Sequence, residues 1–306
     1  MSLLLALLAL LAGGPSVEAR AEHGDAPPGW APDARAARDY SARRVGEVSF
    51  SVRTRRDRWE HRPRMRANSA SLIKAMLLVA YLDQRTVRTR ALGPADREAL
   101  EPMIRFSDNE SASRVREIVG DGAILRLARR ARMRDFRLSA WWGLSQTTAA
   151  DQSRWWLRLP ELTPALHRAY ALRLLGSIVG EQRWGIADAP PDGWRLAFKG
   201  GWGSGRGAVN HQVALLRRGS QRVALAIITN GSPTHEYGEE TLRGVALRLL
   251  RGLAEAPRTA RAAPRPAAPP QVTDTRAAEP PPDVTATPEP APATDRDPFT
   301  PAPPPP

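Results

Sequence analysis

Residues 69–82 read SASLIKAMLLVAYL, a run of good helix formers that is apolar on nearly every side. A helix without a polar face belongs in a protein interior, so this stretch predicts the buried central helix of a domain. Its first turn carries two polar side chains, Ser71 and Lys74. Positions three residues apart lie on one face of a helix, so the Lys74 amine is expected within reach of the Ser71 hydroxyl.

The segments around this helix predict an α+β fold. Before it, Val48, Phe50 and Val52 alternate with polar residues, which is the period-two pattern of a half-buried strand. After it, the sequence predicts helices over residues 110–119, 122–132, 148–158 and 163–179. The C-terminal part predicts strands over 194–199, 211–216 and 222–229, and then an amphipathic helix over 237–253. This order is typical of an antiparallel sheet built from both ends of a domain.

Composition divides the chain into regions. An apolar run followed by an Ala-x-Ala pattern at Ala19 and Ala21 predicts a signal peptide over residues 1–21. Residues 22–42 hold few large apolar side chains and are interpreted as a linker, and residues 43–255 as one folded domain. The last 50 residues hold 17 of the 29 prolines, which predicts a disordered tail over residues 256–306. The leader predicts a secreted or cell-envelope protein that contacts a membrane only if the leader is retained.

The formal net charge of +13 suits an anionic partner, such as an acidic cell-wall polymer. The arginines are spread along the sequence without a zinc, basic-zipper or RNA-binding motif, so no specific nucleic-acid partner is predicted. An arginine-rich polyanion binder remains an alternative. The absence of cysteine excludes disulfides, thiolate metal sites and cysteine nucleophiles, and the five histidines show no metal spacing. No metal or cofactor is therefore expected.

Only two of the 45 basic residues are lysine, Lys74 and Lys199. Arginine keeps its proton at any accessible pH, whereas a buried lysine can become neutral and act as a base. A serine hydroxyl such as that of Ser71 becomes nucleophilic when an adjacent base accepts its proton. Lys199 ends a predicted strand and is followed by glycines, which let a substrate lie close to the backbone. The two lysines are therefore candidates for catalytic positions.

A third polar segment, Ser107-Asp108-Asn109, lies between the lysines in a predicted loop. Alone, such a tripeptide more often caps a helix, and a lone Ser-x-x-Lys is a weak signal. The order Ser-x-x-Lys, Ser-Asp-Asn, Lys-Gly-Gly nevertheless resembles the three-motif set of class A β-lactamases and penicillin-binding proteins. The resemblance covers about residues 45–253.

This resemblance implies a β-lactamase/transpeptidase-like fold, with a five-stranded antiparallel sheet flanked by helices and a small helical subdomain that holds Ser107. It also implies roles for individual residues. Ser71 would attack a carbonyl and Lys74 would accept its proton, while Ser107 would relay a proton. Lys199 would steady that relay and a substrate carboxylate. Substrate binding would fall to Asn109, Gly200, Gly201 and Trp202, with the N–H groups of Ser71 and Trp202 as the oxyanion hole.

The chain also departs from the family pattern. Gly200 stands where the family usually has threonine or serine, so a hydroxyl for the substrate carboxylate is missing. The gap of 36 residues from Ser71 to Ser107 is shorter than usual and implies a trimmed helical subdomain.

The stretch 137–152, where class A enzymes carry the glutamate that activates water, contains no glutamate. Its only carboxylate, Asp151, is expected in the first turn of the following helix, and Gln146 can position a water but cannot deprotonate it. Acylation is therefore expected and rapid deacylation is not.

Three other features receive structural interpretations. The tryptophan pairs at 141–142 and 155–156 are interpreted as core packing rather than as a substrate groove. His211 is expected to have a structural role beside the cleft. The glycine run from 201 to 207 predicts a flexible hairpin connection and lacks the spacing of a nucleotide-binding loop.

The resulting hypothesis is an exported serine hydrolase that forms an acyl-enzyme at Ser71 with a small-molecule β-lactam or a D-alanyl peptide of peptidoglycan. A penicillin-binding or sensing domain that acylates without efficient deacylation is the alternative.

Overall fold

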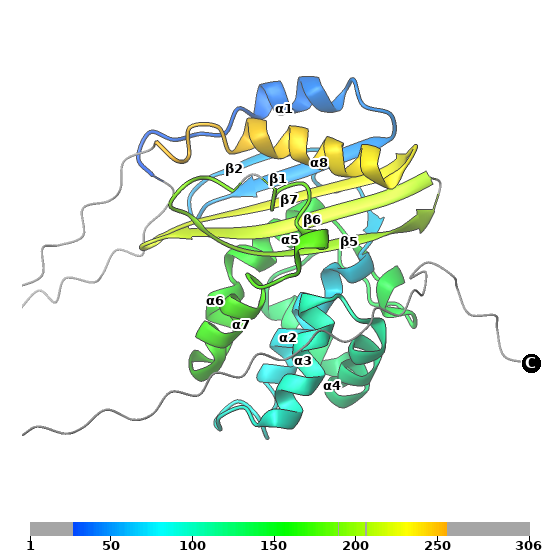
Figure 1. Cartoon of the computed structure of the whole chain (residues 1–306), viewed down its shortest axis with the longest axis vertical. Helices are drawn as coiled ribbons and strands as arrows, with labels where there is room; N and C mark the ends of the chain where they lie inside the picture. Colours follow the sequence, from blue (N-terminus) through cyan, green and yellow to red (C-terminus); the bar gives the residue numbers. More distant parts are fainter. Residues whose placement is uncertain (1–26, 189, 206, 256–306) are drawn as a thin grey trace, which may run out of the picture. The chain divides into compact units, whose positions relative to one another are not determined.

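The computed structural model describes residues 27–188, 190–205 and 207–255 (Figure 1). The predicted signal peptide over 1–21 and the predicted tail over 256–306 lie outside the described residues. Within the described part, no helix has the length and apolar character needed to span a membrane.

A five-stranded antiparallel sheet forms the centre of the fold, as predicted. Its order is β2-β1-β7-β6-β5, so the N-terminal strand lies beside the last strand of the domain and β5 is an edge strand. The strands are β1 (Glu47–Arg53), β2 (Arg58–His61), β5 (Arg195–Gly205), β6 (Gly207–Arg218) and β7 (Gln221–Ser232). Two short strands, β3 (Ala67–Asn68) and β4 (Gln146–Thr147), pair separately beside the site.

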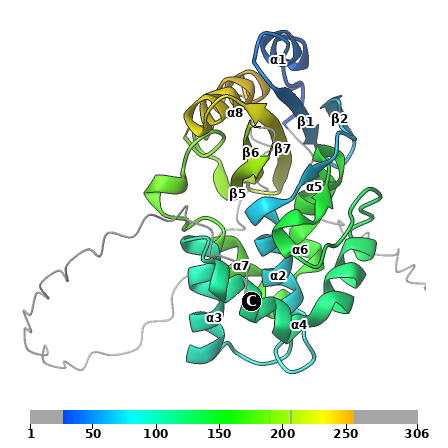
Figure 2. The same ribbon diagram turned by 90° about the vertical axis from the view of Figure 1, so that its right-hand side faces the viewer.

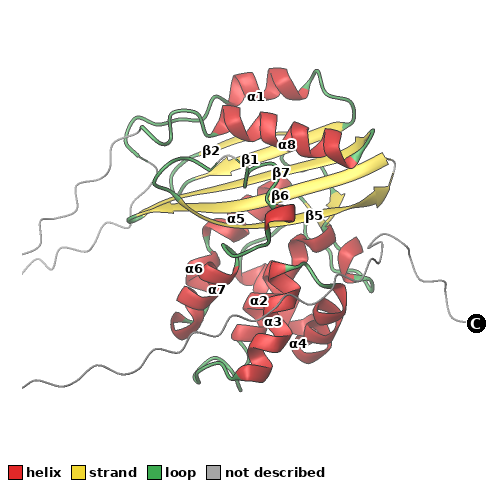
Figure 3. Cartoon of the chain, in the orientation of Figure 1, coloured by secondary structure: helices red, strands yellow, loops and turns green. Residues whose placement is uncertain are grey.

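Helices cover both faces of this sheet (Figure 3). One face carries α8 (His235–Leu249), with α1 (Ala34–Ser41) packed against it. The other face carries α5 (Ala149–Leu157). The remaining helices lie on the α5 side (Figure 2), and they are α2 (Ile73–Leu82), α3 (Pro94–Arg105), α4 (Asn109–Arg130), α6 (Leu159–Leu162) and α7 (Arg168–Leu174).

The predicted central helix is confirmed. Every residue of α2 is buried, and a short 3-10 turn, η1 (Ala70–Leu72), precedes it. The helices predicted on either side of residue 120 are the two halves of α4, which breaks at Gly120 where φ is 70° and ψ is 155°. The helix predicted over 163–179 is shorter, because α7 ends at Leu174 and the following backbone bonds to β5.

Two predictions near the sheet need revision. The glycine run forms the predicted hairpin connection, but residues 201–205 and Gly207 belong to the paired ends of β5 and β6, so β5 extends beyond the strand predicted over 194–199. Within the region interpreted as a linker over 22–42, residues 34–41 form α1, which buries Ala37 completely. The alanines on one face of this segment pack closely against α8, and short side chains of this kind carry little hydrophobic signal in a sequence.

Candidate active site

Ser71 lies in η1, directly before the start of the buried helix α2, and is partly exposed. The segment before it is held in place by β4 and its loop, since Ser69 N donates to the carbonyl of Ser145 over 2.6 Å. Ala70 has a positive φ of 44°, a conformation that costs a residue with a side chain roughly 1–2 kcal/mol. Backbone strain of this kind is often stored at functional sites.

The Lys74 amine is fully buried and is held by the Ser-Asp-Asn segment. It donates to the carbonyl of Ser107, lies 3.2 Å from the Ser107 hydroxyl and donates to Asn109 Oδ1 over 2.7 Å. Within the described part of the chain, no hydrogen bond joins this amine to Ser71. The structure therefore shows Lys74 engaged with the second motif, one helical turn from the Ser71 position.

The hydroxyl of Ser107 lies between the two lysine amines, 3.2 Å from Lys74 Nζ and 3.0 Å from Lys199 Nζ. Lys199 also donates to the carbonyl of Gly200 over 2.9 Å. A hydroxyl has one proton and two lone pairs, so it can accept from an ammonium while it donates to a neutral amine. The arrangement is a path for a proton between the two lysines.

Burial sets the protonation of both amines. It lowers the pKa of Lys74 to about 7, and the nearby Asp108 carboxylate offsets only part of this effect. Burial, together with the charge of Lys74, holds the pKa of Lys199 well below its ordinary value. Two ammonium groups around one hydroxyl repel each other, so the pair favours a state in which at least one of the two amines is neutral. Near neutral pH Lys74 is thus divided between its protonated and neutral forms.

Asp108 also organises the second motif. Its carboxylate accepts from Ser111 N over 2.6 Å and so caps the start of α4, which is the helix-capping role that the tripeptide suggested. The capped turn leaves Ser107 with a positive φ of 58° and directs its side chain toward the lysines.

The edge strand β5 passes directly against η1. A Cβ atom at Gly201 would lie 3.0 Å from Ser71 N and 3.2 Å from Leu72 N, so only glycine permits this approach. Because β5 is an edge strand, one side of its backbone is not used by the sheet. This close passage brings the backbones of the two predicted oxyanion-hole residues, Ser71 and Trp202, to the same place.

Gly200 is covered by the side chain of Trp184, which no motif of the sequence indicates. A Cβ atom at Gly200 would lie 3.1 Å from the indole of Trp184. The same indole packs edge-on against Trp202, with ring centroids 6.2 Å apart. The space that a threonine or serine side chain would need is therefore reduced by Trp184.

The tryptophans divide into two groups. Trp155 and Trp156 are fully buried, as predicted for core residues. Trp141 is 77% exposed, so the core interpretation is wrong for it. Trp142 lies in the 3-10 turn η2 (Trp142–Leu144), with its ring centroid 4.9 Å from Lys74 Nζ. Sequence pattern does not separate these roles, because an aromatic pair looks the same in a core and beside a cleft.

No carboxylate of the stretch 137–152 faces the lysines. Asp151 lies in the first turn of α5, as predicted, is fully buried and accepts from the backbone N–H groups of Arg134 and Asp135 over 2.8 and 2.7 Å. Gln146 donates to Asn68 Oδ1 on the neighbouring strand.

His211 on β6 is fully buried and pairs with Gly201 on the neighbouring strand β5. Its Nε2 lies 3.0 Å from the carbonyl of Asn68, and Thr229 N donates to its Nδ1 over 3.3 Å. Its Nδ1 also lies 2.9 Å from the carbonyl of Asn210, and a neutral imidazole has one proton and can donate to only one of these two carbonyls. Burial lowers the pKa of His211 to about 4. The imidazole thus ties the segment before Ser71 to the sheet.

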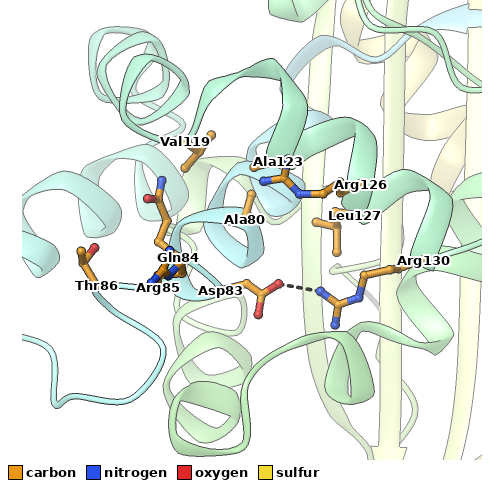
Figure 4. A pocket seen from close by; sticks show the side chains of 10 residues that line it. All are labelled: Ala80, Asp83, Gln84, Arg85, Thr86, Val119, Ala123, Arg126, Leu127 and Arg130. Carbon is orange, nitrogen blue, oxygen red and sulfur yellow. Dashed lines mark hydrogen bonds and ion pairs between the residues drawn. The ribbon is translucent and has the colours of Figure 1, made fainter.

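A separate hollow of about 360 Å³ lies at the other end of α2 (Figure 4). It is lined by residues of α4 and of the chain that follows α2, and Asp83 and Arg130 form an ion pair of 2.5 Å there. A helix rises about 1.5 Å per residue, so this hollow is roughly 18 Å from Ser71 along the helix axis. None of the predicted site residues lines it.

Comparison with known proteins shows which family the chain matches. A family model described as the beta-lactamase enzyme family matches residues 95–253, about half of the chain. The match includes the segments around Ser107 and Lys199 and begins after Ser71 and Lys74. No curated protein gives a significant sequence match.

Solved structures of β-lactamases are similar to the chain in fold. A β-lactamase from Sphaerobacter thermophilus superposes with a TM-score of 0.63 at 19% identity, covering 74% of this chain and 98% of its own. An ancestral class A β-lactamase gives a TM-score of 0.61 at 18% identity, with 71% and 98% covered. A β-lactamase from Desulfarculus baarsii gives 0.58 at 22% identity, with 70% and 96% covered.

Proposed function

This chain belongs to the beta-lactamase enzyme family, and from that premise we propose that it is a serine hydrolase with Ser71 as nucleophile and Lys74 as base. The substrate class proposed is a β-lactam or a related D-alanyl peptide, both of which present a carbonyl beside a carboxylate. Export to the cell envelope belongs to the same proposal, since both substrates occur outside the cytoplasm.

One observation supports this function above all: the Ser107 hydroxyl stands between two buried amines, and one of them, that of Lys74, lies in the first turn of the helix that follows Ser71. A fully buried amine without a carboxylate hydrogen-bonded to it has no evident value for stability, because burying an unpaired charge is costly. Such a group is expected where a titratable amine is required for chemistry.

The proposed reaction begins when neutral Lys74 accepts the proton of Ser71. The Ser71 oxygen then bonds to the substrate carbonyl carbon, and the negative charge on the carbonyl oxygen is held by the N–H groups of Ser71 and Trp202. As the carbon–nitrogen bond breaks, the leaving nitrogen takes a proton that Lys74 supplies through the Ser107 hydroxyl. Lys74 Nζ donates to Asn109 Oδ1 in the structure. A substrate amide that donates to Asn109 Oδ1 instead would free the Lys74 amine to turn toward Ser71.

A penicillin-binding or sensing domain is a second candidate, supported by the position of Asp151. Deacylation requires a base for the attacking water, and the carboxylate nearest in sequence to the family's glutamate is bonded to backbone N–H groups away from the lysines. The acyl-enzyme is then expected to persist.

Mass spectrometry of the intact protein after exposure to benzylpenicillin tests the proposal. The wild type is expected to gain the mass of one ring-opened penicillin. Ser71→Ala is expected to gain none, and Lys74→Met is expected to acylate at least about 100-fold more slowly, since general base catalysis contributes about 10²–10⁴-fold. An adduct that forms equally on Ser71→Ala would contradict the assignment of the nucleophile.

A further inference from the structure

Trp142 separates the Lys74 amine from an open groove. On one side, its ring centroid lies 4.9 Å from Lys74 Nζ. On the other, Trp142 lines a groove of about 660 Å³ that it shares with Trp141 and with Ser113 of α4. Lys74 itself has no exposed surface, so the indole is a layer between the amine and the solvent in this groove.

Hydrogen bonds fix both the side chain and the backbone of Trp142. Its Nε1 donates to Ser113 Oγ on α4 over 3.2 Å, and the Ser69 hydroxyl donates to the Trp142 carbonyl over 3.3 Å. Arg116 of α4 donates to the carbonyl of Ala140 over 2.5 Å and so fixes the loop that carries the indole. Trp142 and its loop are therefore hydrogen-bonded both to α4 and to the segment that precedes Ser71.

We propose that Trp142 is a positioning residue that closes the Lys74 side of the site to water. It thereby keeps Lys74 a proton acceptor and makes an acyl-enzyme at Ser71 long-lived. The second consequence rests on the proposed function. Hydrolysis of that ester needs a water whose oxygen bonds to the acyl carbon, whose proton a base accepts, and whose attack returns the Ser71 oxygen to its hydroxyl. In this proposal the indole occupies the side from which a water in the groove would approach the Lys74 amine.

Two effects of the indole on Lys74 oppose each other. A ring face attracts an ammonium, whereas exclusion of water disfavours the charged form. The other charged groups that face this amine are Lys199 on β5, which disfavours the ammonium, and Asp108 at the start of α4, which favours it. Burial has the largest effect, so removal of the indole is expected to favour the protonated form.

Lysine-selective NMR measures this directly, because the chain has only two lysines. With ¹³Cε-labelled lysine, the Lys74 signal of the wild type is expected to titrate near pH 7. In Trp142→Ala its midpoint is expected to rise by about one pH unit or more. Trp142→Phe keeps a ring over the amine and is expected to behave like the wild type. Trp141→Ala is the matched control, because this neighbour is 77% exposed.

The lifetime of the penicillin adduct is the second readout, measured by intact-mass spectrometry after free penicillin is removed. Trp142→Ala is expected to lose the adduct at least about tenfold faster than the wild type, whereas Trp142→Phe and Trp141→Ala retain it. Thermal unfolding of each variant identifies any that fail to fold, and Trp142→Leu then replaces Trp142→Ala with a smaller cavity.

The two readouts separate the two proposals. If the wild type forms no adduct, the proposed function fails, and the NMR titration still decides whether Trp142 covers the amine. If the adduct forms but Trp142→Ala leaves both the Lys74 titration and the adduct lifetime unchanged, the role of Trp142 is overturned.

Discussion

The effect of His211 on the free energy of unfolding depends on pH. Its imidazole has no exposed surface, and burial lowers its pKa to about 4 in the folded protein, against an ordinary value near 6.5. Between these values the unfolded chain takes up a proton and the folded protein does not. The free energy of unfolding therefore keeps its full value above pH 6.5 and decreases as the pH falls toward 4, by about 3 kcal/mol from this residue.

Urea denaturation of the wild type and of His211→Gln at a series of pH values measures this contribution. The glutamine can still donate to the carbonyl of Asn68, but it does not titrate. The loss of stability between pH 6.5 and pH 4 is expected to be smaller in the variant by about 3 kcal/mol. Parallel curves for the two proteins over this range would show that His211 is not a neutral buried imidazole.

Single residues of the site differ in how far the sequence predicts them. Lysine is so rare in this chain that Lys74 and Lys199 stand out, and the serine motifs follow from their spacing. The structure brings both lysine amines to the hydroxyl of Ser107. Trp142 and Trp184, which cover Lys74 and Gly200, have no such signal, because what they cover depends on the path of loops far away in the sequence.

At the level of elements, the close passage of β5 against η1 determines where Ser71 lies. A methyl group at Gly201 would meet the backbone nitrogens of Ser71 and Leu72 at 3.0 and 3.2 Å, and backbone atoms cannot swing aside as a side chain can. Gly203 lies two residues along the same strand, and a Cβ atom there would meet nothing within 4 Å. The two positions are a matched pair.

Gly201→Ala is expected to slow acylation by penicillin at least about 100-fold, because a displacement near 1 Å at a nucleophile can cost that much. Gly203→Ala is expected to stay within about twofold of the wild type, as substitutions at open positions usually do. Rates of labelling with a fluorescent penicillin provide the comparison. Equal rates for the two variants would mean that the contact between β5 and η1 does not position Ser71.

Elements with strong periodicity were predicted, and those without it were not. Every residue of α2 is buried, as predicted. The alternation in β1 predicts a strand correctly, but the half-buried character is wrong, because Ser49 and Ser51 are as fully buried as the apolar residues between them. The helix α3 was missed because Pro102 lies inside it and its composition is polar. Its start does carry a signal, since Pro94 occupies the first turn and Asp96 accepts from Gly93 N over 2.7 Å.

For the molecule as a whole, the segment interpreted as a linker is part of the described fold. Trp30 is only 9% exposed, packs edge-on against Trp59 at 6.0 Å, and its Nε1 donates to the carbonyl of Arg251 over 3.0 Å. Further along, Tyr40 lies so close to α8 that a Cβ atom at Gly244 would meet its ring at 2.3 Å. The N-terminal segment thus packs against β2, against α8 and against the chain that follows α8.

Trp30→Ala is therefore expected to lower the free energy of unfolding by about 2–3 kcal/mol, through lost burial and the carbonyl of Arg251 left without its donor. For a domain of this size the melting temperature should fall by roughly 4–12 °C. Trp141→Ala removes the same side chain from a site that is 77% exposed and should leave the melting temperature nearly unchanged. Thermal unfolding followed by circular dichroism compares the two. If both variants melt with the wild type, the segment before β1 is a linker after all, because a tryptophan that stabilises nothing belongs to no core.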